Sequence, residues 1–383
     1  MRNGYKVFDA DTHFHPSVES LEPYLDSALR ARSGELNRRE FKTGWAGEPL
    51  TEPYRHNYQL GEMGGWGVAP PRHLGEPGPR PNAERHFQHF MGTAYPTEGS
   101  ADYAIEARIS DMNREGQDAH LLVPGVGSGH EDVSVDIGML QGLHRYLDDV
   151  CGRYPDRLLS MVVADARFIE ESVGEIKQWA GKPWVKGVHL SLPLDFPVDH
   201  PSMDPIWQAA DDAGLCIIHH SFATGYPGYR DLWESPFIGR TASHPWGAMR
   251  MVAAFMGAGI FDRFPNIRLS ILESGFGWLP FWMKRMEDQV TYMGYVKKDL
   301  QHSMSEYMTG GRFFASIVMH EGEDMVRAVN QFMGDHILMF GSDYPHAESR
   351  FPDSVDIATG WKSLGDDSMR KLMWDNAARC FGL

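Results

Sequence analysis

The sequence predicts an α/β chain folded as a (β/α)8 TIM barrel with a long insertion after the first strand. Beyond residue 100, stretches with helical spacing of apolar residues alternate with short apolar runs, which are typical of buried parallel strands. An apolar strand leads into Asp11-Thr12-His13-Phe14-His15 near the start, and another leads into Gly341-Ser342-Asp343 near the end. Because the first and eighth strands of a barrel are neighbours, these two polar segments fit one pocket. An open doubly wound sheet is the alternative.

Eight strands are expected, each a short apolar run bounded by polar or turn residues. They span residues 5–8, 119–123, 158–164, 185–190, 215–219, 267–272, 313–318 and 337–340. Helices are expected between them at residues 105–115, 133–154, 169–180, 205–213, 245–264, 278–295 and 324–333. The regular alternation favours one barrel domain over residues 1–383 rather than two domains.

The exception to this alternation is the segment of residues 35–100, which is rich in Gly, Pro, Trp, Arg and His. A long insertion after the first strand of a barrel emerges on the catalytic face, so we expect a lid or a wall of the substrate pocket. A disordered surface loop is the alternative, which the aromatic residues of the segment disfavour. The loop at 221–246 has the same composition and leaves the same face after the fifth strand.

The composition excludes several classes of protein. The formal net charge of −16 argues against a nucleic-acid or anionic-membrane partner, for which a basic surface is expected. No run of apolar residues reaches the roughly 18 of a membrane span, and the N-terminus has no signal-peptide pattern, so we expect a soluble cytoplasmic protein. The three cysteines are far apart and form no C-x-x-C pair, which disfavours a disulfide framework or a cysteine zinc site.

Polar residues at the ends of the expected strands indicate a metal site. His13 and His15 are two apart, and side chains two apart in a strand share a face, so they could bind one cation; an exposed polar strand face is the alternative. Because barrel strands end at one pocket, further polar side chains are expected beside this pair, namely His189, His219, His220, Glu273, His320 and Asp343. Imidazole and carboxylate groups together suit Zn²⁺ or Mn²⁺.

Six motifs along almost the whole chain carry a resemblance to a known family. They are Asp11-x-His13-x-His15 and the segments 214–220, 261–265, 272–280, 341–346 and 376–383. Together they resemble the amidohydrolase-2 branch of the amidohydrolase superfamily, which includes aminocarboxymuconate-semialdehyde decarboxylase and γ-resorcylate decarboxylase. The resemblance implies one divalent metal held by His13, His15, His220 and Asp343, and commonly a homodimer. Inward and outward alternation along the strand equally admits His219 as the fifth-strand ligand.

Glu273 departs from the family pattern. The decarboxylases of this branch carry a catalytic histidine after the sixth strand, where this chain has Glu273. A carboxylate there could act as general base or proton shuttle, and a structural pair with Arg285 is the alternative. His244, in the loop before a helix, and Arg72 in the insertion are candidate substrate contacts.

The first functional expectation is a metal-dependent hydrolase of a small aromatic or carboxylated compound. Metal-activated water would attack the substrate, and Asp343 and Glu273 would move protons. Non-oxidative decarboxylation of a hydroxylated aromatic acid is an alternative, and a non-catalytic metal-binding barrel is another. One Zn²⁺ is the first expectation for the cofactor and Mn²⁺ the second, because this ligand set accepts several divalent ions. His346 and Glu348 lie just beyond Asp343, either supporting the site or in solvent.

Overall fold

Eight parallel strands follow one another round a single sheet, which confirms the predicted barrel. In the order in which they pair they are β1 (Phe8–Phe14), β4 (Ala119–Pro124), β5 (Leu158–Asp165), β6 (Val185–Ser191), β7 (Cys216–His220), β8 (Arg268–Leu272), β9 (Phe313–Ser316) and β10 (Leu338–Met339). The structure, a computed structural model, describes residues 1–41, 55–59, 105–125, 130–192, 196–220, 236–294 and 299–383. The strands pair in the same order in which they occur along the chain. Right-handed strand–helix–strand units produce this arrangement.

The barrel closes between β1 and the chain that follows β10. The amide of Ala10 donates to the carbonyl of Phe340 at 2.9 Å, and the amide of His13 donates to the carbonyl of Tyr344 at 2.6 Å. A parallel bridge between Thr12 and Tyr344 extends this contact beyond the end of β10. Backbone hydrogen bonds therefore join the first and last strands, which the sequence predicts to be neighbours.

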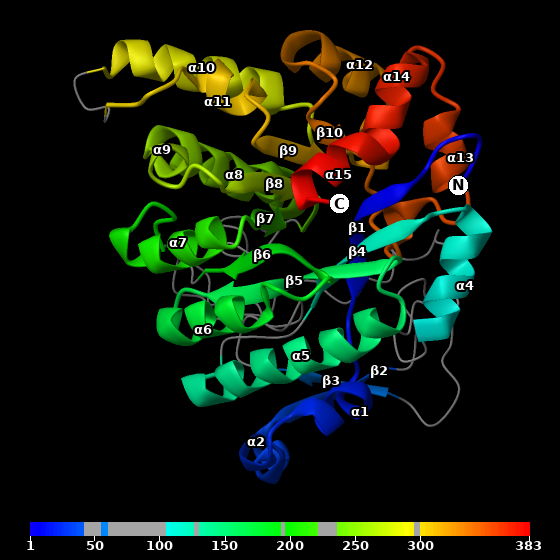
Figure 1. Cartoon of the computed structure of the whole chain (residues 1–383), viewed down its shortest axis with the longest axis vertical. Helices are drawn as coiled ribbons and strands as arrows, with labels where there is room; N and C mark the ends of the chain where they lie inside the picture. The colour runs from blue at the N-terminus through cyan, green and yellow to red at the C-terminus, as the bar shows by residue number, and fades with distance from the viewer. Residues whose placement is uncertain (42–54, 60–104, 126–129, 193–195, 221–235, 295–298) are drawn as a thin grey trace.

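Helices surround the strands, from α5 and α6 in the lower half of the view to α10 and α12 at its top (Figure 1). From residue 105 onward the described α-helices are α4 (Ile105–Glu115), α5 (Val133–Arg153), α6 (Ile169–Trp179), α7 (Asp204–Asp212), α8 (Pro236–Gly257), α9 (Ile260–Arg263), α10 (Leu279–Tyr292), α11 (Met304–Thr309), α12 (Gly322–Met333), α13 (Ser354–Thr359), α14 (Gly365–Arg370) and α15 (Asn376–Phe381). Their apolar faces and the outer face of the sheet share one continuous core.

A second, smaller core fills the inside of the barrel. Alternate strand residues such as Leu121, Met161 and Ile218 form it, and α15 covers its lower end with Phe381, whose ring stacks on Phe8 with centroids 5.6 Å apart. Figure 1 shows α15, in red, beside β1 and β9. The amino-terminal end of the barrel is therefore closed by packing, so a functional site is expected at the carboxyl end.

Among the element boundaries that differ from the sequence-based expectation, two bear on the functional site. The first strand was expected at residues 5–8 but runs over Phe8–Phe14, because residues 9–14 pair with β4 on one side. Helix α8 begins at Pro236 and continues through Pro245, so the expectation that His244 lies in a loop before a helix is wrong. Proline commonly occupies the first turn of a helix, which is why the sequence places the start of this helix at Pro245, but Pro245 lies inside α8.

The segment after β1 is partly described. Helices α1 (Val18–Leu21) and α2 (Ser27–Ala31) are followed by an antiparallel pair, β2 (Asn37–Phe41) and β3 (Arg55–Gln59). The rest of the predicted insertion, including Arg72, lies outside the described residues. Within the residues that the structure describes, none of the helices has the length and apolar character that crossing a membrane requires.

Candidate metal centre

His13 reaches the mouth of the barrel because β1 changes phase part-way along. Phe8 and Ala10 point into the barrel core, and strict alternation would send residue 14 inward as well. The register of β1 against β4 shifts between Asp9 and Thr12, and beyond this irregularity Phe14 packs in the outer core. The shift therefore gives His13 the inward direction, as β-bulges near active sites commonly do.

Buried hydrogen bonds fix the backbone at His13. Its amide donates to Tyr344, and its carbonyl accepts from the guanidinium of Arg108, which is fully buried on α4. The same guanidinium lies 5.0 Å from the centre of the Tyr344 ring, and the Tyr344 hydroxyl donates to Asp111 at 2.6 Å. His13 therefore occupies a rigid position, with 4 % of its surface exposed.

Two acidic residues of the site have strained backbones. Glu273 follows β8 with φ of 45°, and Asp343 follows β10 with φ of 65°. Residues other than glycine seldom adopt positive φ, and such conformations cluster at functional sites. The amide of Asp343 donates to the carbonyl of Asp11 at 2.9 Å, which anchors this turn against β1. Both side chains are directed into the mouth of the barrel, where they meet His13.

The side chains of Asp11, His13, His220, Glu273 and Asp343 form what we call the donor cluster. The Nε2 atom of His13 lies 2.7 Å from Asp343 Oδ1 and 3.0 Å from Glu273 Oε2. The Nε2 atom of His220 lies 3.0 Å from the same Glu273 oxygen and 3.4 Å from Asp11 Oδ1. All five residues are buried, and their donor atoms fall into two overlapping groups in which every pair lies within 4.8 Å.

The donor cluster fits a divalent cation. Among the described residues, no hydrogen-bond partner is found for the buried atoms Asp11 Oδ1, His13 Nε2 and Asp343 Oδ2. Buried charged groups without partners are costly unless they are paired or coordinate a metal. Imidazole nitrogens with carboxylate oxygens form a ligand set for Zn²⁺ or Mn²⁺. The structure thus supports a divalent-metal site, as the sequence predicts.

The acid–base properties of the cluster reflect this crowding. Burial lowers the pKa of His13, but Asp343 and Glu273 outweigh burial and raise it to about 9. Burial raises the pKa of Asp343, and the neighbouring Glu273 carboxylate adds to the effect, so that it reaches about 7. Burial also raises the pKa of Glu273, yet His220 and His13 together hold it well below its ordinary value. His13, Glu273 and Asp343 share protons with one another, and a cation that binds to these side chains would displace those protons.

The predicted ligands differ in how closely they approach the cluster. His220 belongs to it, whereas His219 is buried on β7 and is in none of the candidate metal-binding groups of the described residues. His15 lies at the edge, grouped with His13 and His346. Its ring rests on Gly125, where a Cβ atom would stand 2.1 Å from the ring. Burial and the positive charges of His13 and His346 lower the pKa of His15 well below its usual range.

Other predicted residues have clear positions. His346 Nδ1 lies 2.6 Å from Asp343 Oδ1, so His346 supports the site. His244 Nε2 lies 3.6 Å from Glu273 Oε1, which brings this residue of α8 to the cluster. Arg285 is half exposed and lies 3.7 Å from Asp288, so the alternative of a structural pair between Glu273 and Arg285 is wrong.

Asp9 and Asp11 were not assigned roles from the sequence. The carboxylate of Asp9 is fully buried and accepts hydrogen bonds from the amides of Ser342 and Asp11 and from the side chain of Gln117. It thereby fixes the backbone beside Asp343. The acidic spacing Asp9-x-Asp11-x-His13 is visible in the sequence, but only the structure shows which of these residues face the site and which support it from below.

Comparison with known proteins matches almost the whole chain to one family. A family model described as amidohydrolase matches residues 10–383. Among curated proteins, γ-resorcylate decarboxylase of Polaromonas sp. is 24 % identical over 132 residues, which cover 33 % of this chain and 38 % of that protein. The chain thus matches well under half the length of this curated relative.

Solved structures share the fold. An amidohydrolase of Mycobacterium avium subsp. paratuberculosis has a TM-score of 0.71 at 18 % identity, covering 99 % of this chain and 100 % of that one. The 5-carboxyvanillate decarboxylase of Novosphingobium aromaticivorans, in complex with manganese, has a TM-score of 0.68 at 18 % identity, covering 100 % and 97 %. These likenesses support the barrel independently of the motifs.

Proposed function

The chain belongs to the amidohydrolase family and is an enzyme, and from this premise we propose that it is a metal-dependent decarboxylase of a hydroxylated aromatic acid. The observation that carries the proposal is the buried donor cluster at the carboxyl end of the barrel. Several of the similar proteins are decarboxylases of such acids, and this favours decarboxylation over the hydrolysis that the sequence favours. A non-catalytic barrel is the least supported of the three alternatives.

We propose that His13, His220 and Asp343, with His15 at the edge, hold one divalent cation. When bound, the cation would supply a positive charge for the substrate's carboxylate and neighbouring hydroxyl group and would stabilise negative charge that develops on the ring. The carboxylates of Asp11, Glu273 and Asp343 make the site rich in oxygen donors, which favours Mn²⁺ over Zn²⁺. The manganese complex of the 5-carboxyvanillate decarboxylase also favours Mn²⁺.

The reaction requires a proton at the ring carbon. The bond between the ring and the carboxyl group breaks, CO₂ leaves, and the vacated carbon takes a proton. Asp343 Oδ1 accepts from His346 at 2.6 Å, while Oδ2 is buried and has no hydrogen-bond partner among the described residues. We propose that Oδ2 holds the proton that is delivered to the ring. His346, with 18 % of its side chain exposed, is placed to return a proton from solvent.

The proposal also covers the role of the insertion and the number of subunits. We propose that residues 35–100 form a wall of the substrate pocket and that Arg72 and His244 contact the substrate. We also propose a homodimer. Exposed apolar side chains on the neighbouring helices α10 and α12 support it (Figure 1). Phe281 on α10 is 62 % exposed, and Phe332 on α12 is 64 % exposed. Light scattering of the purified protein tests the dimer.

A substrate panel tests the reaction. The protein, loaded with Mn²⁺ or Zn²⁺, is incubated in D₂O with benzoates that carry a hydroxyl group beside the carboxyl group. We expect CO₂ and a phenol that bears deuterium at the vacated carbon. Benzoates without the hydroxyl group are the control, and Asp343→Asn should form no product. If the protein instead hydrolyses esters, lactones or amides and releases no CO₂ from any acid, the decarboxylase proposal is wrong and the enzyme is a hydrolase. Glu273 in place of histidine favours that second candidate.

A further inference from the structure

We propose that Glu273 is itself a ligand of the divalent cation, rather than a residue that only moves protons. The resemblance gives no metal-binding role to the residue after the sixth strand, where related decarboxylases carry histidine. In this chain the position is occupied by a carboxylate that is 4 % exposed and lies inside the donor cluster. The proposal concerns metal binding, so it stands whether the enzyme is a decarboxylase or a hydrolase.

The distances place Glu273 among atoms that would share one cation. Its Oε2 atom lies 3.0 Å from Nε2 of His13 and 3.0 Å from Nε2 of His220. Donors bound to one cation at about 2.1 Å lie roughly 3.0–3.4 Å from one another. A carboxylate oxygen equally close to both imidazole nitrogens would therefore be placed to bind the same cation. A residue that only delivers protons would face the substrate instead of both ligands.

The backbone holds Glu273 in this position. The φ of 45° directs the side chain inward, and the amide donates to Ser316 Oγ at 3.3 Å. The next turn is fixed by Glu321, whose carboxylate accepts from the amides of Phe276 at 3.2 Å and Gly277 at 2.7 Å. These hydrogen bonds hold the backbone of the turn at and after Glu273, so the base of its side chain has a fixed position. Such rigidity is characteristic of a metal ligand.

The second oxygen of Glu273 has its own neighbour. Oε1 lies 3.6 Å from Nε2 of His244 on α8. An outer partner of this kind orients a ligating carboxylate and is a recurrent feature of metal sites. His244 would then act as a positioning residue for Glu273. With Asp11 and Asp343, Glu273 brings three carboxylates to the cluster, a negative charge that a dication offsets.

Metal titration tests the proposal without reference to activity. Binding of Mn²⁺ is measured by the loss of the free-ion electron paramagnetic resonance signal, and the visible spectrum of bound Co²⁺ reports the number and type of its ligands. The proteins are the wild type, Glu273→Gln, Glu273→His and the control Glu115→Gln. Glu115 is also a buried glutamate, 1 % exposed, but it accepts from Ser354 and lies outside the donor cluster.

We expect Glu273→Gln to weaken Mn²⁺ binding by about 100-fold and to change the Co²⁺ spectrum, since the loss of a ligand costs at least as much as the loss of an outer partner. Glu273→His should still bind metal but should prefer Zn²⁺ over Mn²⁺, because imidazole suits zinc. Glu115→Gln should bind like the wild type.

Normal Mn²⁺ affinity and an unchanged Co²⁺ spectrum in folded Glu273→Gln would overturn the proposal and leave Glu273 as a proton-transfer residue. Failure of the wild type to bind any of these ions would also overturn it. If the metal data agree with the proposal but no acid is decarboxylated, only the proposed reaction is wrong. Glu273→His binds metal only if it folds, so it separates the loss of a ligand from a loss of structure at this position.

Discussion

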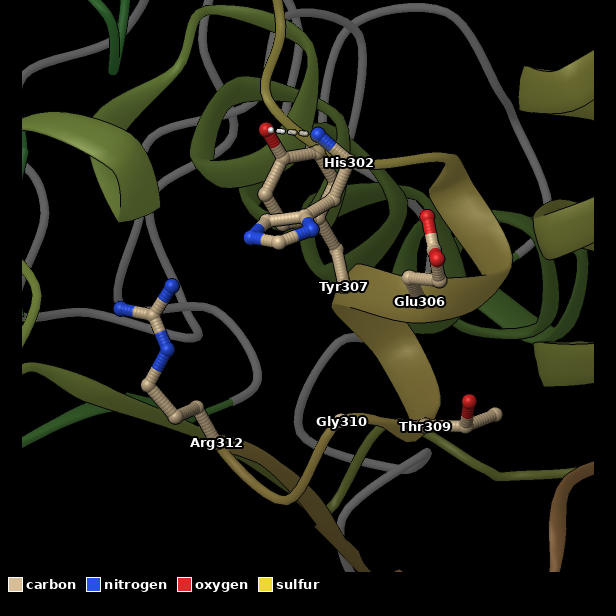
Figure 2. A pocket seen from close by; sticks show the side chains of 6 residues that line it. All are labelled: His302, Glu306, Tyr307, Thr309, Gly310 and Arg312. Carbon is tan, nitrogen blue, oxygen red and sulfur yellow. Dashed lines mark hydrogen bonds between the residues drawn. The ribbon is translucent and has the colours of Figure 1, made fainter.

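The two ends of the barrel both gather charged and polar side chains, but these side chains serve different purposes. At the amino-terminal end a pocket lies beside α11 and the start of β9, lined by His302, Glu306, Tyr307, Thr309, Gly310 and Arg312 (Figure 2). At the carboxyl end the donor cluster gathers imidazole and carboxylate groups. The comparison shows which property of a pocket indicates function.

In the amino-terminal pocket the polar groups are used by the local backbone. The guanidinium of Arg312 donates to the carbonyls of Phe261, Phe264 and Pro265 at 3.0–3.2 Å. Glu306 completes a capping box at the start of α11. The Tyr307 hydroxyl accepts from the amide of His302, the bond drawn as a dashed line in Figure 2. These groups hold turns together and do not converge on a common point.

In the donor cluster the polar groups instead converge on a common point. Nε2 of His13, Oδ1 of Asp11 and Oδ2 of Asp343 converge without hydrogen-bond partners among the residues described. Leaving such groups buried is unfavourable unless a ligand completes them. The presence of a hollow is therefore a weaker sign of function than the convergence of buried, unsatisfied donors from separate strands.

Removal of a ligand should produce the largest effect. His13→Ala and Asp343→Ala should each lose the single bound metal and at least about 1,000-fold in activity, because the cation stabilises the transition state. Elemental analysis and steady-state rates are the measurements. His302→Ala, at the other end of the barrel, is the control and should keep both. Full metal content in the first two variants would mean that the donor cluster is not the metal site.

Removal of Arg312 should affect stability and not metal binding. Arg312→Ala leaves three carbonyl groups without their donor, so we expect a loss of about 3 kcal/mol in the free energy of unfolding. Urea denaturation measures it. Arg327→Ala is the matched control, since Arg327 is 60 % exposed and pairs with the neighbouring Asp324, and we expect a change within about 0.5 kcal/mol. A loss of bound metal in Arg312→Ala would contradict the division between the two ends.

The pH dependence of stability should reveal the titration of Glu115, the last residue of α4, at the amino-terminal end of the barrel. Burial raises its pKa from 4.5 to about 7 in the folded protein. Between these values the folded state binds more protons than the unfolded state, so stability falls as the pH rises, by about 3 kcal/mol at most. Denaturation of wild type and Glu115→Gln from pH 4.5 to 7.5 measures this. An equally steep fall in the variant would assign the effect to other groups.

The smallest effect is expected at Gly125, beside His15. In Gly125→Ala the new Cβ would stand 2.1 Å from the imidazole, so His15 must move. We expect activity to fall about 10-fold with little change in stability, in line with the cost of misplacing a supporting group. Gly152→Ala, where no atom lies within 4 Å of the new Cβ, is the control. Normal activity in Gly125→Ala would indicate that His15 is not needed in its present position.

Several local features predicted the fold correctly. Short apolar runs separated by helical periodicity marked the barrel strands, because a parallel strand buried on both faces must be apolar along its length. The motifs at the ends of the strands predicted the amidohydrolase family and a divalent-metal site. These predictions succeeded because residue type and spacing within a few positions determine them.

Other features depended on contacts between distant parts of the chain. The choice between His219 and His220 could not be made from alternation, and the structure brings His220 to the cluster. The inward direction of His13 depends on a register shift against β4, which no local pattern in residues 8–14 reveals. Glu273 could have paired with Arg285 as far as spacing was concerned.

The sequence by itself therefore determined the barrel, the type of metal site and most of the candidate ligands, since these follow from hydrophobic periodicity and from the chemistry of side chains at strand ends. The tertiary structure alone decided the phase of β1 and the positive φ values at Glu273 and Asp343. It also decided the place of Glu273 between His13 and His220. The physical reason is that strained backbone and buried charge persist only where the packing of remote segments holds them.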